Sequence, residues 1–150
     1  WLSHQVPCAI GTDSHVVRQW PAELRWLEYG QRLVRRQRNV AAAPEAGQPS
    51  TAAVLFHRAL HAGAQAAGLP AWGLVAGARA DFLVLDRANT GLVGVPQDHL
   101  LDALVFATDE PAFDQVWVQG TCRVELGRHT RAEAHAQALS QAMQALWPER

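Results

Sequence analysis

The segment Ile10–His15 (IGTDSH) holds the residues of this chain best suited to chemistry. The apolar run Val6–Gly11 predicts a buried strand, and Asp13 lies two residues after it. In barrel enzymes the active site lies at the C-terminal ends of the strands. A short carboxylate there can bind a divalent metal through one oxygen and take a proton from a metal-activated water through the other. Asp13 is therefore a candidate catalytic residue and metal ligand.

The same motif has a simpler interpretation. Gly-Thr-Asp-Ser is typical of turns, and the Asp13 side chain could cap the next helix or close an Asx turn. Taken alone, the motif does not decide between a catalytic and a structural aspartate.

Histidines and cysteines offer weaker candidates. His57 and His61 are four residues apart on a predicted helix, but the HExxH pattern is absent, which favours two surface histidines. His15 follows Asp13 closely and could line the mouth of a site. Cys8 and Cys122 form no CxxC pair, so the sequence predicts a reducing, cytoplasmic compartment.

Composition excludes several classes of protein. The chain has 150 residues, of which 49% are hydrophobic and 18% charged, and its formal net charge is −1. This balance is typical of a chain that buries a core. A near-neutral charge without a basic, aromatic stripe argues against nucleic acid as a partner. No apolar run approaches the roughly 20 residues of a membrane span.

The elements that would position Asp13 begin with helices. Pro21 favours a helix start, and the apolar spacing after it predicts a helix to about Arg38, with Glu28 and Arg32 as an i,i+4 pair. Residues 41–50 predict a loop. Ser50 or Thr51 would cap a second helix that ends at Gly68, with its packed stripe at these positions: Ala53, Phe56, Leu60, Gly63 and Ala67.

After Trp72 the periodicity changes to that of short strands. Strands are predicted at Gly73–Val75, Ala80–Asp86, Phe113–Gln119 and Thr121–Leu126. Periodicity leaves Asp98–Ala107 undecided between a helix and a turn. Thr130 would cap a last, alanine-rich helix running to about Trp147.

Two phrases together indicate a family. IGTDSHV followed by AELRWLEYGQRLVRRQRNV resembles the end of the catalytic barrel in the formimidoylglutamate deiminases of the amidohydrolase superfamily. GLVAGARADFLVLD resembles the small β-sandwich domain of that superfamily, and VWVQGTCRVELGRH resembles its closing hairpin. The resemblance covers residues 8–129.

The resemblance implies an α/β fold: the C-terminal end of a (β/α)8 metal-dependent barrel, most of the small β-sandwich domain, and a C-terminal helix. The corresponding ranges are 1–69, 70–128 and 129–150. It implies one divalent metal, usually zinc, with Asp13 as its aspartate ligand and proton acceptor. Metal-binding histidines and substrate-binding residues have no counterpart here, so this chain alone is expected to be inactive.

The implied reaction converts N-formimidoyl-L-glutamate and water to N-formyl-L-glutamate and ammonia, in histidine degradation. The partner would be a small-molecule substrate, with neither nucleic acid nor membrane, and a homodimer is left open. Two alternatives stay open: another aminohydrolase of the superfamily, acting on guanine, cytosine or adenosylhomocysteine, and a non-catalytic α+β module.

Overall fold

The computed structural model describes residues 1, 4, 6–14, 17–110 and 112–147. The first helix, α1 (Trp20–Arg35), begins with Pro21 in its first turn, as predicted. It ends earlier than the predicted Arg38 because Arg36 adopts the left-handed conformation, with φ 53°. A left-handed residue after the last helical turn is a common way for a helix to stop.

The second helix, α2 (Thr51–Ala66), confirms both predicted ends. The Ser50 hydroxyl accepts a hydrogen bond from the backbone N–H of Ala53 at 3.0 Å, and Gly68 follows the helix with φ 67°. A short 3-10 helix, η2 (Pro44–Ala46), precedes it within the predicted loop.

The predicted packed stripe of α2 is only partly right, since Phe56 alone of its positions packs against the core cluster. The buried residues of this helix are Thr51, Ala52, Val54, Leu55 and Ala62, whereas the predicted positions are half-buried or exposed. The helix contacts both α1 and α3. Where these neighbours lie decides which side chains are covered, and helical periodicity alone does not contain that information.

The strands form an antiparallel sheet in the order β1-β2-β3-β4. Their bounds are Phe82–Leu85, Phe113–Val118, Thr121–Glu125 and Arg128–His129. Gln119 and Gly120 connect β2 to β3 with φ of 51° and 72°, the left-handed pair that suits a two-residue hairpin. The predicted strands at residues 80–86, 113–119 and 121–126 are thus confirmed, while β4 was not predicted.

Two other predicted strands do not form among the described residues. Val6–Gly11 and Gly73–Val75 belong to no strand. A strand needs a neighbour for its backbone N–H and C=O groups, and neither segment pairs with the sheet. Gly73 has φ 100°, which suits a bend rather than a pleated strand.

The undecided segment at residues 98–107 is helical. A 3-10 turn, η3 (Gln97–His99), leads into α3 (Leu100–Phe106), whose Leu104 and Val105 are buried. Val105 joins a core cluster with α1 and α2, and Leu104 joins a second cluster beside the sheet. Burial on two sides therefore stabilises this short helix.

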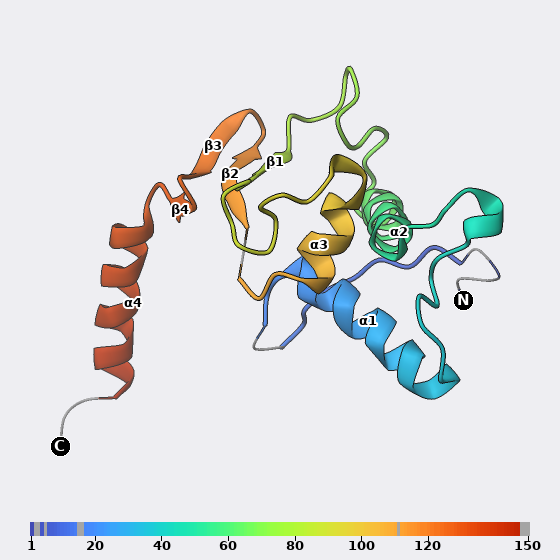
Figure 1. The fold of residues 1–150 in the computed structure, drawn as a ribbon. Coiled ribbons are helices and arrows are strands. Elements are labelled where there is room, and N and C mark those ends of the chain that lie inside the picture. The colour runs from blue at the N-terminus through green and yellow to red at the C-terminus, as the bar shows by residue number, and fades with distance from the viewer. Residues whose placement is uncertain (2–3, 5, 15–16, 111, 148–150) are drawn as a thin grey trace.

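The last helix, α4 (Ala132–Leu146), lies apart from the other three helices (Figure 1) and buries none of its residues. Thr130 does not cap it as predicted. Arg131 occupies the N-cap position without a side-chain cap, and the Thr130 hydroxyl donates to the Arg123 carbonyl at 3.3 Å instead.

Candidate functional site

Asp13 lies in an exposed turn between the Val6–Gly11 segment and α1. Its φ is 46°, in the left-handed region that Asp tolerates better than most residues. The carboxylate makes no hydrogen bond or ion pair with any residue that the structure describes. It does not cap α1, whose N-cap residue is Gln19 and carries no side-chain cap. Asp13 therefore does not cap α1, and an Asx turn to the residues after Ser14 would lie outside the described residues.

Two apolar anchors hold the turn that carries Asp13. Before it, Ile10 packs against the core cluster of α1, α2 and α3. After it, the Trp20 ring lies 5.0 Å from the Phe56 ring and 6.2 Å from the Phe113 ring. Trp20 contacts both core clusters. Helix α2 and the sheet therefore both hold the start of α1, and the core cluster holds the chain before the turn.

A metal requires more ligands than this site supplies. A catalytic zinc takes three protein ligands and one open position, and among residues 1, 4, 6–14, 17–110 and 112–147 no group of three metal-binding side chains occurs. An accessible, unpaired carboxylate is a suitable oxygen donor. Asp13 fits one ligand of a metal centre, and the described residues do not complete the set.

The histidine candidates have surface roles. His57 and His61 are both exposed on α2, and the His61 ring Nδ1 lies 2.7 Å from the His57 carbonyl oxygen. Neither histidine belongs to a group of three metal-binding side chains among the described residues. His15 lies outside the described residues. Cys8 and Cys122 are free, half-buried thiols whose Sγ atoms donate to the carbonyls of Val6 and Val124.

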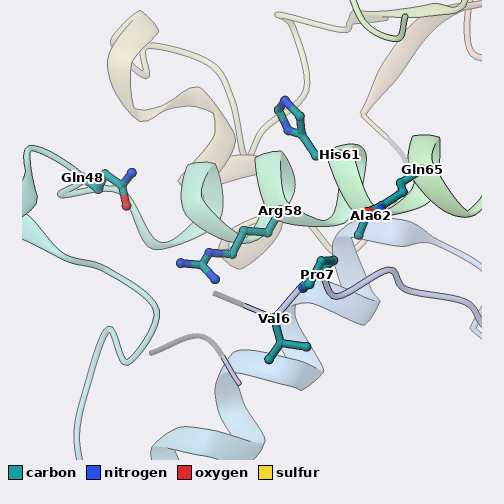
Figure 2. Close-up of a pocket in the computed structure, with 7 residues that line it drawn as sticks. All are labelled: Val6, Pro7, Gln48, Arg58, His61, Ala62 and Gln65. Atoms are coloured by element: carbon teal, nitrogen blue, oxygen red, sulfur yellow. The ribbon is translucent and has the colours of Figure 1, made fainter. Parts of the chain in front are cut away.

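A pocket of about 380 Å³ lies between the N-terminal segment and α2 (Figure 2). Arg58 is half-buried at this pocket, whose lining residues are Val6, Pro7, Gln48, Arg58, His61, Ala62 and Gln65. In Figure 2 the Arg58 and His61 side chains point in different directions. The lining holds no carboxylate, and Asp13 does not take part in it. This pocket is therefore separate from the candidate metal ligand.

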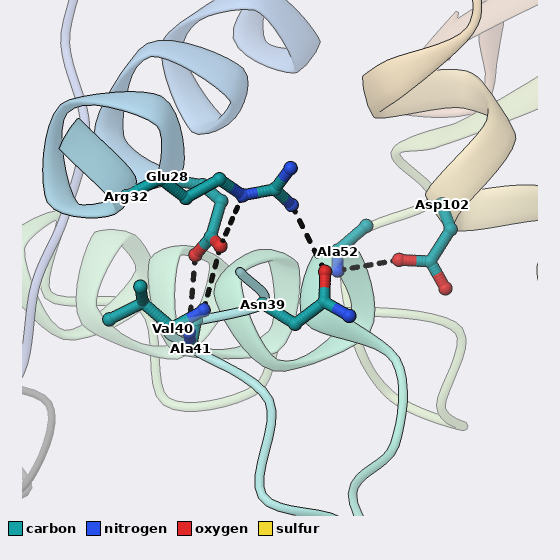
Figure 3. Close-up of polar contacts among 7 residues, drawn as sticks. All are labelled: Glu28, Arg32, Asn39, Val40, Ala41, Ala52 and Asp102. Carbon is teal, nitrogen blue, oxygen red and sulfur yellow. Dashed lines mark hydrogen bonds and ion pairs between the residues drawn. The ribbon is translucent and has the colours of Figure 1, made fainter. Parts of the chain in front are cut away.

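The carboxylate of Glu28 links α1 to the loop that follows this helix (Figure 3). It is 1% exposed. Its Oε1 accepts hydrogen bonds from Arg32 Nε and the Val40 backbone N–H, both at 2.8 Å, and its Oε2 accepts from the Ala41 N–H at 3.1 Å. The i,i+4 spacing predicted the ion pair with Arg32 but not the two backbone donors. These donors bring the chain after α1 back against the helix.

A second carboxylate stabilises the start of α2. Asp102 on α3 accepts a hydrogen bond from the Ala52 N–H at 2.9 Å (Figure 3). Together with Ser50 it satisfies two of the free N–H groups at that helix end. Sequence analysis found Ser50 from its position but could not find Asp102, which lies 50 residues away.

Asp81 links the chain before β1 to the β2–β3 turn. Its Oδ1 accepts a hydrogen bond from the Gln119 backbone N–H at 2.7 Å, and Arg79 donates to its Oδ2. The Gln119 hydrogen bond is the main cause that lowers the pKa of Asp81 below its ordinary 3.8, against desolvation, and Arg79 adds to the effect. The shift reflects a structural contact far from Asp13.

The comparisons with known proteins identify a relative. No family model matches the chain. Formimidoylglutamate deiminase from Pseudomonas aeruginosa is 42% identical over 134 residues, which is 89% of this chain and 29% of that protein. This chain is related to formimidoylglutamate deiminase. The family resemblance predicted from IGTDSHV and ELRWLEYGQRL is thereby confirmed.

A solved structure supports the relationship to the deiminase. The crystal structure of an amidohydrolase from Brucella melitensis matches 92% of this chain and 30% of its own, with a TM-score of 0.81 and 41% identity. The chain spans less than one third of the length of either relative. Among its described residues, no helix is long and apolar enough to cross a membrane.

Proposed function

We propose that this chain is a part of a formimidoylglutamate deiminase and supplies one metal ligand, Asp13, to the active site. The observation that carries the proposal is the 42% identity over 134 residues to a deiminase. The exposed position of Asp13, in the turn between the packed Ile10 and the first helix, supports it.

The reaction would take N-formimidoyl-L-glutamate and water to N-formyl-L-glutamate and ammonia. The metal, zinc in this proposal, would supply a water of lowered pKa as the nucleophile. One Asp13 oxygen would hold the metal. The other would accept the proton released as water attacks the formimidoyl carbon, and would pass it to the departing nitrogen. The hydroxyl group of the tetrahedral intermediate would give the second proton of the water to the same nitrogen, and the C–N bond would break to release ammonia and leave the formyl carbonyl.

The architecture proposed for the complete enzyme is a (β/α)8 barrel with a small β-sandwich. Residues 1–69 would contribute the last strand and helices of the barrel, residues 70–128 most of the sandwich, and residues 129–150 the final helix. The backbone of Val6–Gly11, without a strand partner among the described residues, supports this arrangement. Barrel strands pair on both sides, so this segment would gain its neighbours from the remainder of the barrel.

The setting of the enzyme follows from the same proposal. It would be a cytoplasmic enzyme of histidine degradation that acts on a small molecule, without nucleic acid or membrane as a partner. Two free thiols and a net charge of −1 support this setting. Since one carboxylate cannot make a metal centre by itself, residues 1–150 alone would be inactive.

A chimera tests the proposal. The matching segment of the Pseudomonas aeruginosa deiminase is replaced by residues 1–150, and ammonia release is measured with formimidoylglutamate, guanine and cytosine. We expect release from formimidoylglutamate alone, and Asp13→Asn should lower kcat/KM by about 1,000-fold or more through the loss of metal and proton acceptor.

The controls separate catalysis from folding. Asp98→Asn replaces another exposed aspartate and should leave activity and metal content unchanged. Metal content, measured by mass spectrometry, should fall in the Asp13→Asn chimera. The midpoint temperature of its thermal unfolding should equal that of the unsubstituted chimera. Full activity of the Asp13→Asn chimera would remove Asp13 from the site, and activity on guanine or cytosine would favour a different aminohydrolase.

A further inference from the structure

Helix α1 carries an exposed apolar stripe on the side that faces away from the core. Its buried side holds Leu24 and Glu28. The exposed fractions of Trp26, Leu33 and Val34 are 63%, 81% and 80%. Trp26 and Leu33 are seven residues apart and Val34 follows, so the three side chains share one side of the helix. We call these three residues the α1 stripe.

Helix α4 carries a second apolar stripe. Leu139, Met143 and Leu146 follow the i, i+4, i+7 spacing of one helix face, and their exposed fractions are 63%, 45% and 72%. We call these three residues the α4 stripe. Helix α4 buries none of its residues. Isolated helices of about 15 residues are marginal in water, and packing of an apolar face supplies most of a helix's stability. The α4 stripe therefore needs a surface to pack against.

The accessible surface of the chain indicates how large that packing surface is. The chain exposes 11173 Å², whereas a compact folded monomer of the same mass, 16.4 kDa, exposes about 7,500 Å². The excess of roughly 3,700 Å² is several times the roughly 800 Å² that each partner buries in a standard protein interface. The chain therefore has the surface of one part of a larger body.

Area and position together distinguish a longer polypeptide from a second copy of this chain. A two-fold dimer buries one self-complementary patch on each copy, and one patch of standard size would leave most of the excess exposed. Helices α1 and α4, which carry the two stripes, lie on different sides of the molecule (Figure 1). A larger body can contact several sides at once. The 29% match leaves more than two thirds of the related deiminase outside this chain.

We propose that the part of a deiminase that lies outside this chain packs against the α1 stripe and the α4 stripe together, so that both become interior contacts of the whole enzyme. This inference rests on the proposed function and goes beyond it, because it assigns a partner to two helix faces that take no part in the Asp13 site. The covering surface is apolar, with a hydrogen-bond acceptor for the indole N–H of Trp26, which can only donate.

A charge placed in the α1 stripe gives one test. In the deiminase chimera described above, Leu33→Glu should lower Tm by about 3 °C or more, because burial of a carboxylate without a partner is costly. In residues 1–150 alone the same change should leave Tm as it is, since Leu33 is 81% exposed there. The matched control, Gln37→Glu, adds the same charge at an exposed position two residues beyond α1 and should leave Tm unchanged in both proteins. An equal response of the chimera to the two changes would overturn the inference.

Hydroxyl-radical labelling, read by peptide mass spectrometry, tests the packing without any substitution. Residues 1–150 alone and the unsubstituted chimera are labelled at matched doses. In the chimera the labelling of Trp26, Leu33 and Met143 should fall by about 5-fold or more, because close-packed interfaces exclude water. The fall should be the same in dilute and in concentrated chimera, since the covering surface belongs to the same polypeptide.

The labelling also separates this inference from its alternatives. Unchanged labelling of either stripe in the chimera would refute it, because that helix would still face solvent. A fall that occurs only in concentrated chimera would refute it too and would assign the stripes to a second copy. Ammonia release by the same chimera is measured separately. An active chimera with labelled stripes would thus reject the packing and leave the proposed function standing, and an inactive chimera with protected stripes would do the reverse.

Discussion

Glu28 and Arg32, one turn apart on α1, form an ion pair whose carboxylate is buried and whose guanidinium is half-buried. Glu28 Oε1 lies 2.8 Å from Arg32 Nε, and the side-chain exposures are 1% and 26%. Exposed pairs with this spacing contribute only a few tenths of a kcal/mol. This pair differs because the carboxylate also accepts the Val40 and Ala41 N–H groups, so Glu28 connects a helix to the loop that follows it.

Replacement of Glu28 by alanine should therefore destabilise the chain strongly. We expect the free energy of unfolding to fall by about 3 kcal/mol, because the buried Ala41 N–H and the half-buried Val40 N–H lose their acceptor. Arg32→Ala, which leaves both donors bonded, should cost about 1 kcal/mol. Urea denaturation followed by circular dichroism measures both, and equal losses in the two variants would contradict this account.

Gly91 occupies a place where no side chain fits. A Cβ there would lie 2.7 Å from the Ala107 carbonyl oxygen and 2.8 Å from Thr108 Cγ2. Gly91→Ala should thus lower the free energy of unfolding by about 1 to 3 kcal/mol, the cost of overpacking. Gly63 on α2 is the matched control, since a Cβ there meets nothing within 4 Å.

Gly63→Ala should raise stability by about 0.4 to 1 kcal/mol, because alanine restricts the unfolded chain and favours helix. Thermal unfolding of the two variants side by side gives opposite shifts of the midpoint. If both alanines shifted Tm in the same direction, close packing at Gly91 would not be the cause.

The lowered pKa of Asp81 predicts an acid-sensitive contribution to stability. The folded state holds the proton less tightly than the unfolded state, whose carboxyl keeps its ordinary pKa of 3.8. The contribution is therefore complete well above pH 3.8 and is lost as pH falls through that value towards the folded pKa. Asp81→Asn should remove this part of the pH dependence.

Arg79→Gln distinguishes the causes of that shift. Because the Gln119 N–H is the largest single cause of the lowered pKa, this variant should keep the part of the pH dependence that this hydrogen bond supplies. Chemical denaturation between pH 3 and 6 gives the free energy of unfolding of the wild-type chain and of the Asp81→Asn and Arg79→Gln variants. Loss of the full dependence in Arg79→Gln would assign the effect to the ion pair instead.

The left-handed conformation of Asp13 predicts a conflict between stability and function. Glycine has no Cβ penalty at φ 46°, so Asp13→Gly should stabilise the chain by about 1 kcal/mol. The same change removes the proposed ligand, and the chimera carrying it should bind less metal. Denaturation and metal analysis of one protein test both effects, and destabilisation by glycine would show that the carboxylate has a structural partner.

Local signals in the sequence determined the parts of this fold that depend on near neighbours. Pro21 and Ser50 start helices because their own backbone and side-chain geometry favours the first turn. Residues 113–126 form a hairpin because alternating strands flank a turn that Gly120 can close. IGTDSHV and ELRWLEYGQRL likewise sufficed to name the related family.

Only the tertiary structure decided what depends on distant neighbours. Val6–Gly11 is apolar enough for a strand but has no strand beside it among the described residues. Asp98–Ala107 is helical because Leu104 and Val105 pack into two cores. The Asp102 contact at α2 also arises from positions in space. A sequence pattern records what each residue prefers locally, and packing then decides which preferences are met.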